Sequence, residues 1–578
     1  MDEREILTRF KAGTLDRAQA TLLLAGATAR TPGPAPAPPE RPHTAAPAAG
    51  GPSATDGRYA VVGLAGRYPL ADDPHALFEN LSAGRDTARC APAERPGPSV
   101  LAPGQRGHFL DGIAQFDAEF FGLTPREGAL LDPQERLLLE AAWLALEDAG
   151  CTGARLDALN GPGGAPRSVG FFIGVSSSDY ALLAAEGREH GLRDMPRSSH
   201  GSLPGRLVAL LRLSGPGQVV DTGVCSALTA VHLAVASLER GECAAAVAGG
   251  AELLLHPSRG GDGAGEGVGA VVLKRLDRAL RDGDRVHAVV RDTFSGFGHA
   301  APRHGADVDI PRGAGGFRLR VTRDTLARRV GDAGAALGIA GLTAALLQAR
   351  HGVLAPAGRG EEPVPWQRAR DEHGRDLPRA AVVEVDDGHG LTAGAVVEEF
   401  LPRPAVAPAE ADGTHQLVLL SAPTPAHLVA GATRLADWLE AHGQDADAPL
   451  LARVARHLRA GRAALPCRIA VLAADVPELL TALRRFAGTG RPGANLRHAD
   501  LRDGADPLHL GRAPETRDYL AALWRSGRLE QLTRLWLSGV EADWAALEGP
   551  AVAGTVVPPP SVFLRQTLWL DAVGERTG

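Results

Sequence analysis

Residues 116–136 read FDAEFFGLTPREGALLDPQER and run directly into PQERLLLEAAWLALEDAG at 133–150. The second segment carries apolar side chains at helical spacing and ends on Gly150, which predicts a long helix over 133–150. Upstream, the apolar run Tyr59-Ala-Val-Val-Gly-Leu, closed by Gly63 and Gly66, predicts a buried strand. A buried strand followed by a strongly periodic helix indicates a mixed α/β domain.

The same alternation continues along the chain. Continuous apolar runs predict strands at 168–175, 218–220, 244–249, 268–273 and 286–290. Helical spacing predicts helices at 226–240 and 338–350. Buried strands that alternate with apolar helices favour a layered α/β architecture whose sheets are covered on both faces.

Composition narrows the class of protein. The chain has 578 residues, is 44% hydrophobic and carries a net charge of −7, which argues against disorder and against a nucleic-acid partner. The five cysteines form neither a disulfide framework nor a CxxC metal motif, so we expect a reducing, cytoplasmic setting, no metal and no cofactor. No apolar run has the length of a membrane span, and the charged start MDEREILTRF is unlike a signal peptide.

Composition shifts divide the chain into five parts. Residues 1–27 predict a helical hairpin, and the Pro- and Ala-rich residues 28–57 predict an extended, disordered linker. The main domain is expected at 58–402, before a second Pro-rich boundary. Residues 413–490 predict a small α/β domain, and 491–578 predict a helical segment, amphipathic over Trp524 to Trp544, with an extended apolar tail.

Several long motifs resemble one family, the ketosynthase (β-ketoacyl synthase) domains of modular type I polyketide synthases. The resemblance rests on the opening strand from Val61, on the block 116–136, on Val220-Asp221-Thr222 with Ala230-Val231-His232, and on Ala248-Gly249-Gly250-Ala251. It implies a thiolase-like α-β-α-β-α fold. Residues 417–439 and 535–544 are similar to the linker region that follows such ketosynthases, and 556–563 to its tail, which packs back on the core.

The family condenses acyl chains with a cysteine nucleophile and two histidines. Its Asp-Thr-Ala-Cys-Ser-Ser-Ser-Leu motif, aligned without a gap, places Val224 at the nucleophile position and Cys225 one residue later. One residue is about 100° around a helix, so Cys225 points elsewhere unless the turn has slipped at the permissive Gly223. Two alternatives follow: a displaced nucleophile, or a small buried cysteine in the core.

Neither family histidine has a clear counterpart. The motif of the first is missing, and His304 is the only nearby His-Gly histidine, either a catalytic base or a solvated loop residue. The second histidine is replaced by Asp332, which cannot supply an imidazole N–H. Asp332 either takes an acid–base role or forms an ion pair with the nearby Arg328 or Arg329.

Other parts of the family's active site are also altered. Two stretches are missing, one between His256-Pro257 and Gly265 and the other between about Gly305 and Arg318. The late glycine-rich loop is reduced to 387–394, without its phenylalanine. By the resemblance, the residues expected to line the substrate site are Gly223, Val224, Arg329 and Thr392.

Retained packing motifs with altered chemistry predict a truncated, catalytically degenerate ketosynthase homologue. We expect a dimer, most simply a homodimer, that lacks condensation activity and binds a phosphopantetheinylated acyl carrier protein, an acyl chain or a partner synthase. An alternative is a thiol-dependent acyltransferase or hydrolase that uses Cys225, or another enzyme that uses the old substrate tunnel. A base for Cys225 would have to be His232, His304 or His389.

Overall fold

The computed structural model describes residues 9, 12, 57–189, 195–196, 200–203, 205–297, 319–356, 361–401, 415–442, 450–502, 504, 514–548 and 556–570. Nearly all of the predicted N-terminal hairpin and of the linker therefore lies outside the described residues. His304 lies outside them too, as does the segment 305–318, where the sequence predicts the second missing stretch.

Strand β1 (Tyr59–Arg67) supplies side chains to two hydrophobic cores. Because strand side chains alternate between faces, Val62 enters the first core and Val61 the second. A register shift between Val61 and Gly63 then exchanges the faces, so that Leu64 joins Val61 in the second core. The apolar run is buried throughout for this reason, instead of alternating with polar residues.

The main sheet has nine strands in the order β4-β3-β5-β6-β1-β7-β12-β11-β8. In chain order, the strands after β1 are β3 (Val169–Gly174), β4 (Gly217–Val220), β5 (Ala245–Glu252), β6 (Gly267–Arg275), β7 (Ala288–Phe297), β8 (Leu319–Thr322), β11 (Ala380–Asp386) and β12 (Leu391–Glu399). The five strands predicted between 168 and 290 are all present. β1 pairs with β6 along nearly its whole length but with β7 only over Tyr59–Val61, so two half-sheets meet at a short junction.

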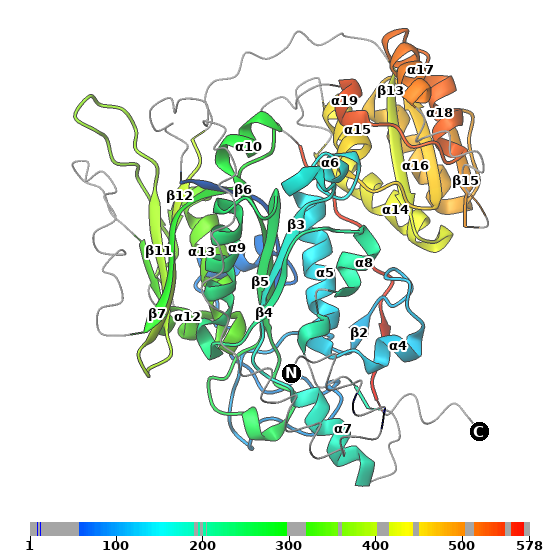
Figure 1. Ribbon diagram of the computed structural model, residues 1–578. Helices are drawn as coiled ribbons and strands as arrows, with labels where there is room; N and C mark the ends of the chain where they lie inside the picture. The colour runs from blue at the N-terminus through cyan, green and yellow to red at the C-terminus, as the bar shows by residue number, and fades with distance from the viewer. Residues whose placement is uncertain are drawn as a thin grey trace. The chain divides into compact units, whose positions relative to one another are not determined.

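Two helices lie between the half-sheets. Figure 1 shows α9 (Ser226–Glu239) and α13 (Leu337–His351) with β7, β11 and β12 on one side and β3, β4 and β5 on the other. Helix α5 (Pro133–Asp148) covers the opposite face of the second half-sheet. The predicted helices are confirmed, and helix and strand layers alternate as the layered α/β prediction requires.

The remaining described helices of the main domain are short. They are α3 (Pro74–Ser82), α4 (Pro125–Leu130), α6 (Ala154–Asp157), α7 (Asp179–Glu189), α8 (Gly205–Leu211), α10 (Leu276–Arg281) and α12 (Arg323–Val330). Single turns of 3₁₀ helix occur at η1 (Pro162–Gly164), η2 (His200–Ser202), η3 (Gly223–Cys225), η4 (Pro257–Arg259) and η5 (Gly334–Ala336). Two short strand pairs are β2 (Gln115–Phe116) with β16 (Gln566–Thr567), and β9 (Val353–Leu354) with β10 (Val364–Pro365).

The block 116–136 folds through two local caps. Thr124 is the N-cap of α4 and forms a capping box with Glu127. Asp132 is the N-cap of α5 and accepts a hydrogen bond from the Gln134 N–H. A proline follows each cap at the first helical position, where no backbone N–H is needed. These caps and prolines explain why α4 and α5 begin where they do.

The C-terminal appended domain is a three-stranded antiparallel sheet, β13 (Gln416–Ala422), β14 (Cys467–Ala473) and β15 (Leu496–Asp500). Helices α14 (Pro425–His442), α15 (Leu450–Gly461) and α16 (Val476–Thr489) pack against it. Because β15 pairs with β14, the sheet extends past residue 490, where the sequence placed a boundary.

The structure has three helices here, α17 (Pro514–Arg525), α18 (Leu529–Leu537) and α19 (Trp544–Glu548). The segment from Trp524 to Trp544, which is predicted to be helical, is therefore divided. Glycines with positive φ interrupt it, Gly527 at 64° and Gly539 at 101°. Glycine adopts a positive φ without steric cost, and a residue with a positive φ cannot continue a right-handed helix.

Asp117, in the block 116–136, joins the appended domain and the tail to the main domain. Its carboxylate accepts hydrogen bonds from Phe120 N at 2.9 Å, His427 Nε2 at 2.6 Å and Leu564 N at 2.5 Å. The side chains of Asp117 and His427 are 2% and 1% exposed. A buried carboxylate is therefore satisfied by one local group and by groups from two distant segments.

We predict that Asp117→Asn destabilises the protein by about 2–3 kcal/mol, because an amide nitrogen cannot accept these bonds and would leave a buried donor unpaired. Denaturant titration followed by tryptophan fluorescence measures the change. The control is Asp111→Asn, whose carboxylate is 48% exposed and pairs with Arg89. Equal stability of the two variants would contradict the role of Asp117.

Candidate functional site

The predicted nucleophile turn lies between β4 and α9. Gly223 has φ +58°, a conformation that favours glycine. Ser226 Oγ donates to Gly223 O at 2.6 Å and accepts from Thr222 N at 2.9 Å, which closes the turn. Ser226 was not singled out from the sequence, although its position after Cys225 matches the hydroxyl-rich family motif.

Cys225 points into the protein. It is 0% exposed, and its Sγ lies 3.4 Å from Val385 O and 3.7 Å from Leu391 O, at the ends of β11 and β12. Burial, and then the carboxylate of Asp387, raise the pKa of the Cys225 thiol to about 11. Since the thiolate is the nucleophilic form, this environment opposes nucleophilic reactivity. The geometry matches the buried-cysteine alternative.

Val224 is half-buried and packs against the second core. It stands at the position where the resemblance places the family's nucleophile, and its side chain carries no group that could accept an acyl chain. Gly223 beside it is exposed. The structure thus brings Gly223, Val224 and Cys225 together at the amino end of α9.

The loop after β11 is a self-contained hairpin turn. Asp387 Oδ1 accepts from His389 N at 2.7 Å and from Leu391 N at 3.0 Å, and these bonds lower the pKa of Asp387. Thr392, half-buried, pairs in the sheet with Gly296 and Asp386. The hairpin covers Cys225 from the side opposite α9.

Asp332 pairs with Arg323, and the predicted pairing with Arg328 or Arg329 is wrong. Arg323 Nη2 lies 2.7 Å from Asp332 Oδ2, and the same guanidinium donates to Asp386 O at 3.3 Å. Arg323 begins α12 and Gly331 (φ +76°) follows its last turn, so the chain bends away from the helix before Asp332. Arg329 instead donates to Pro356 O, which holds it against a different segment.

Of the other candidate bases, His232 has a side-chain partner. His232 Nδ1 lies 2.9 Å from Thr293 Oγ1, on the face of α9 toward β7. His389 is in the hairpin turn. His304 lies outside the described residues.

Residues 263–265, next to the place where the resemblance predicts a missing stretch, bond directly to the segment of Asp332. Asp332 N donates to Gly263 O at 3.0 Å, and Gly265 N donates to Asp332 O at 3.0 Å. Residues Ala264 and Asp332 therefore form a short parallel bridge. These bonds join backbone atoms only, so they need no particular side chain in either segment.

The sequence analysis missed Glu252, a buried carboxylate at the end of β5. Glu252 Oε2 accepts from Ala335 N at 3.0 Å, and Oε1 lies 2.5 Å from Arg259 Nη2. Burial raises the pKa of Glu252 although Arg259 opposes the shift. A charged residue directly after the apolar run 244–251 was the available signal.

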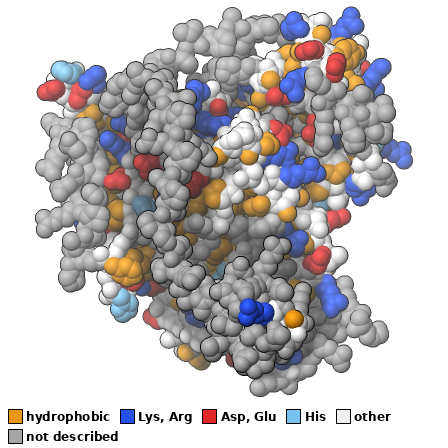
Figure 2. Space-filling model, in the orientation of Figure 1, with side chains coloured by type: hydrophobic (Ala, Val, Ile, Leu, Met, Phe, Trp, Pro, Cys, Tyr) orange, Lys and Arg blue, Asp and Glu red, His pale blue; other side chains and the backbone are white. Residues whose placement is uncertain are grey.

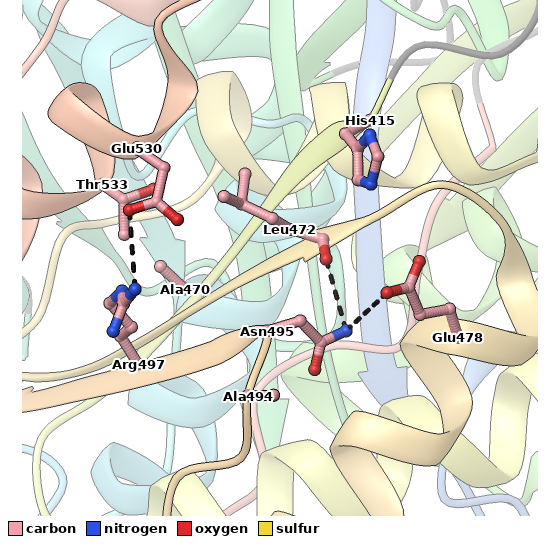
Figure 3. Close-up of a pocket in the computed structure, with 9 residues that line it drawn as sticks. All are labelled: His415, Ala470, Leu472, Glu478, Ala494, Asn495, Arg497, Glu530 and Thr533. Carbon is pink, nitrogen blue, oxygen red and sulfur yellow. Dashed lines mark hydrogen bonds and ion pairs between the residues drawn. The ribbon is translucent and has the colours of Figure 1, made fainter.

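A separate cavity of about 230 Å³ lies in the appended domain (Figure 3). It is lined by His415, Ala470, Leu472, Glu478, Ala494, Asn495, Arg497, Glu530 and Thr533. Arg497 pairs with Glu530 at 3.5 Å, and Asn495 Nδ2 donates to Glu478 Oε1 at 3.1 Å, so its polar groups largely bond to each other. None of the residues predicted as site residues lines this cavity.

Two kinds of feature are absent from the described part of the chain. Its helices include none with the length and apolar content needed to cross a membrane. Its His, Cys, Asp and Glu side chains do not converge in groups of three or more that could hold a metal ion.

Family comparisons cover both the main and the appended domain. Residues 57–262 match the β-ketoacyl synthase N-terminal domain, and residues 419–490 match the RhiE-like KS-MAT linker domain. Cys225 lies within the first match, whereas Asp332 and Thr392 lie beyond it.

Curated relatives are large polyketide synthases. The chain is 34% identical over 627 residues to polyketide synthase ThaG of Burkholderia thailandensis, with 90% of this chain and 11% of that protein covered. It is 29% identical to PksL of Bacillus subtilis, with 89% and 13% covered. The chain thus spans only about a tenth to an eighth of the length of these relatives.

Solved structures agree with the fold. The oxazolomycin ketosynthase domain OzmH KS7 of Streptomyces albus JA3453 matches with a TM-score of 0.71 and 28% identity, over 89% of this chain and 99% of that one. The ketosynthase from module 6 of the bacillaene synthase of Bacillus subtilis 168 gives 0.70 and 25%, over 89% and 100%. The layered fold is therefore the thiolase-like ketosynthase fold predicted from the sequence.

We predict that Cys225 is alkylated slowly in the native protein. With a thiol pKa of about 11, the rate should rise about tenfold per pH unit between pH 7 and 9 as the thiolate fraction grows. Timed iodoacetamide labelling with peptide mass spectrometry measures it, and the exposed Cys90 is the internal control. Labelling of Cys225 as fast as that of Cys90 at pH 7 would contradict the packing described above.

Proposed function

Because this chain belongs to the ketosynthase family of polyketide synthases, we propose that it is a non-condensing member that binds acyl chains carried on a partner protein. The observation that carries the proposal is the closed packing of Cys225 beneath the β11–β12 hairpin. A condensing enzyme needs an accessible, activated thiol, and this thiol has neither property.

The second support is the exchange of histidine for Asp332. A carboxylate paired with Arg323 cannot donate a hydrogen bond to a thioester carbonyl as an imidazole does. The pair is part-exposed, at 44% for Asp332 and 33% for Arg323, and it occupies the place where the resemblance expects the base. The burial of Cys225 and the exchange at Asp332 each take away a group that condensation needs, and neither disturbs the fold.

A phosphopantetheinylated acyl carrier protein or a polyketide synthase module is the partner we propose. This chain corresponds to a small part of each of these polyketide synthases. A partner in the same assembly, or one supplied in trans, is therefore consistent with the proposal. On the face drawn in Figure 2, acidic and basic side chains are interspersed. A mixed surface of this kind suits a protein partner better than a nucleic acid.

The alternative of a thiol-dependent enzyme predicts that Cys225 accepts the acyl chain. The raised pKa of its thiol counts against this mechanism, as does the contact of the candidate base His232 with Thr293. If Cys225→Ala leaves the formation of the pathway product intact, the thiol mechanism is excluded.

We predict that an acyl-loaded carrier protein forms a complex with the wild-type chain, detected by native mass spectrometry, without an acyl adduct on Cys225. The double variant Val224→Cys/Cys225→Ser places the thiol at the family's position and should gain an acyl adduct at residue 224 by at least about tenfold over wild type. It should still not condense, because Asp332 remains.

The matched control is Cys225→Ser alone, which should show no adduct at either position. Rapid acylation of wild-type Cys225 would overturn the non-condensing assignment, and absence of any complex with the loaded carrier would overturn the binding function.

We further propose a homodimer that uses the edge strand β4. Among the described strands β4 has one neighbour, β3, and its Gly217 and Gln218 are exposed. An open strand edge is a template for pairing with another chain, and two copies related by a two-fold axis can pair antiparallel there.

We predict that Gln218→Lys weakens self-association by about tenfold, because it brings like charges together across the paired edges. Sedimentation velocity over a concentration series measures the shift. The control Gln531→Lys places the same charge on exposed α18. Unchanged association of Gln218→Lys would contradict the β4 interface, and a purely monomeric wild type would contradict the dimer.

A further inference from the structure

In the loop after β5, a serine contacts a histidine, and that histidine contacts a glutamate of helix α7. Ser258 Oγ lies 2.7 Å from His256 Nδ1, and His256 Nε2 lies 3.0 Å from Glu186 Oε1. His256 and Ser258 belong to the turn η4, and Glu186 belongs to the facing helix α7. This is the loop from which the resemblance predicts a missing stretch.

The tautomer of His256 follows from the geometry. Ser258 N donates to His256 Nδ1 at 3.2 Å, and because a backbone N–H can only donate, Nδ1 carries the lone pair. The Ser258 hydroxyl therefore donates to the same nitrogen. The proton of the imidazole sits on Nε2, which donates to Glu186. Each group is thus oriented as in a nucleophile, base and carboxylate relay.

The three groups differ in exposure. Ser258 is exposed and the Glu186 side chain is 63% exposed, whereas the His256 side chain between them is only 16% exposed. The backbone before the turn is anchored by Asp179 Oδ2, which accepts from Leu255 N at 3.0 Å and His256 N at 3.2 Å. A reachable hydroxyl therefore rests on a shielded and fixed base.

A cationic side chain belongs to the same turn. Arg259 follows Ser258 in the chain, and the buried Glu252 holds one of its nitrogens. The Arg259 side chain remains 39% exposed, so part of the guanidinium faces solvent. A fixed cation at this place can stabilise the oxyanion that forms on an attacked carbonyl.

A purely structural role accounts for less than what is observed. Capping the turn η4 needs only His256 Nδ1 and the Ser258 N–H. It needs neither the Ser258 hydroxyl nor the contact of Glu186, which comes from another helix. The additional contacts are those that acyl transfer requires.

We propose that Ser258, His256 and Glu186 form a hydrolytic centre for acyl thioesters, with Arg259 as the oxyanion group. The thioester class rests on the proposed function, which brings carrier-bound acyl chains to this protein. Ser258 Oγ attacks the thioester carbonyl and gives its proton to His256 Nδ1. The C–S bond breaks, the thiol leaves with that proton, and water then hydrolyses the acyl-serine to a carboxylic acid and free Ser258.

The experiment uses the full chain and acetyl-N-acetylcysteamine, a thioester that needs no carrier protein. Thiol and acetate release are followed by liquid chromatography. Ser258→Ala should lower kcat/KM by about 100-fold or more, and His256→Asn should do the same. Asn retains the cap because its side-chain oxygen accepts from the Ser258 N–H, so this variant separates folding from base function. Glu186→Gln should lower kcat/KM by about tenfold.

A fluorophosphonate probe gives the second readout. Wild type should be labelled on Ser258 and His256→Asn should not, as mapped by peptide mass spectrometry. The control Ser538→Ala removes an exposed serine on the appended domain and should change neither readout. Unchanged turnover in Ser258→Ala, absence of turnover in wild type, or labelling at another serine alone would each overturn the proposal. Because both probes act without a carrier protein, these outcomes are independent of the carrier complex tested above.

Discussion

The buried carboxylate of Asp117 is the interaction on which the arrangement of the chain depends. It lies in the block 116–136, beside α5, and it accepts hydrogen bonds from that block, from α14 of the appended domain and from the C-terminal tail. A carboxylate that is 2% exposed must accept its hydrogen bonds inside the protein. Moving any one of the three segments away would therefore leave a buried polar group unpaired and lower the stability of the protein. The main domain, the appended domain and the tail are joined through this group.

Packing and chemistry have separated in this fold. The cores, the caps of α4 and α5 and the turn before α9 are those of a ketosynthase. The hairpin 386–391 covers Cys225, the segment of Asp332 bonds to residues 263–265, and Arg323 pairs with Asp332. Stability relies on apolar burial and backbone bonds, which tolerate the loss of catalytic side chains. Reactivity relies on a few exact positions, which do not.

Much of the fold could be predicted because its signals are local. Apolar runs marked the strands, helical spacing marked α5, α9 and α13, and the order of these elements indicated layers. The break at Gly527 was missed because an amphipathic pattern continues across a turn when both helices pack on the same sheet. The partner of Asp332 was missed for a related reason: sequence proximity favoured Arg328 and Arg329, whereas the bend at Gly331 made the more distant Arg323 the neighbour.

The sequence by itself determined that this chain has a ketosynthase scaffold, and it placed Val224 and Asp332 where the resemblance expects a nucleophile and a histidine. These are statements about identity and order along the chain, which local patterns preserve. Only the tertiary structure decided that the Cys225 thiol faces two carbonyl oxygens of the β11–β12 hairpin, and that Glu186 of α7 meets His256. The reason is that these contacts join segments 70 to 166 residues apart, and the distances between such segments are set by how the layers pack.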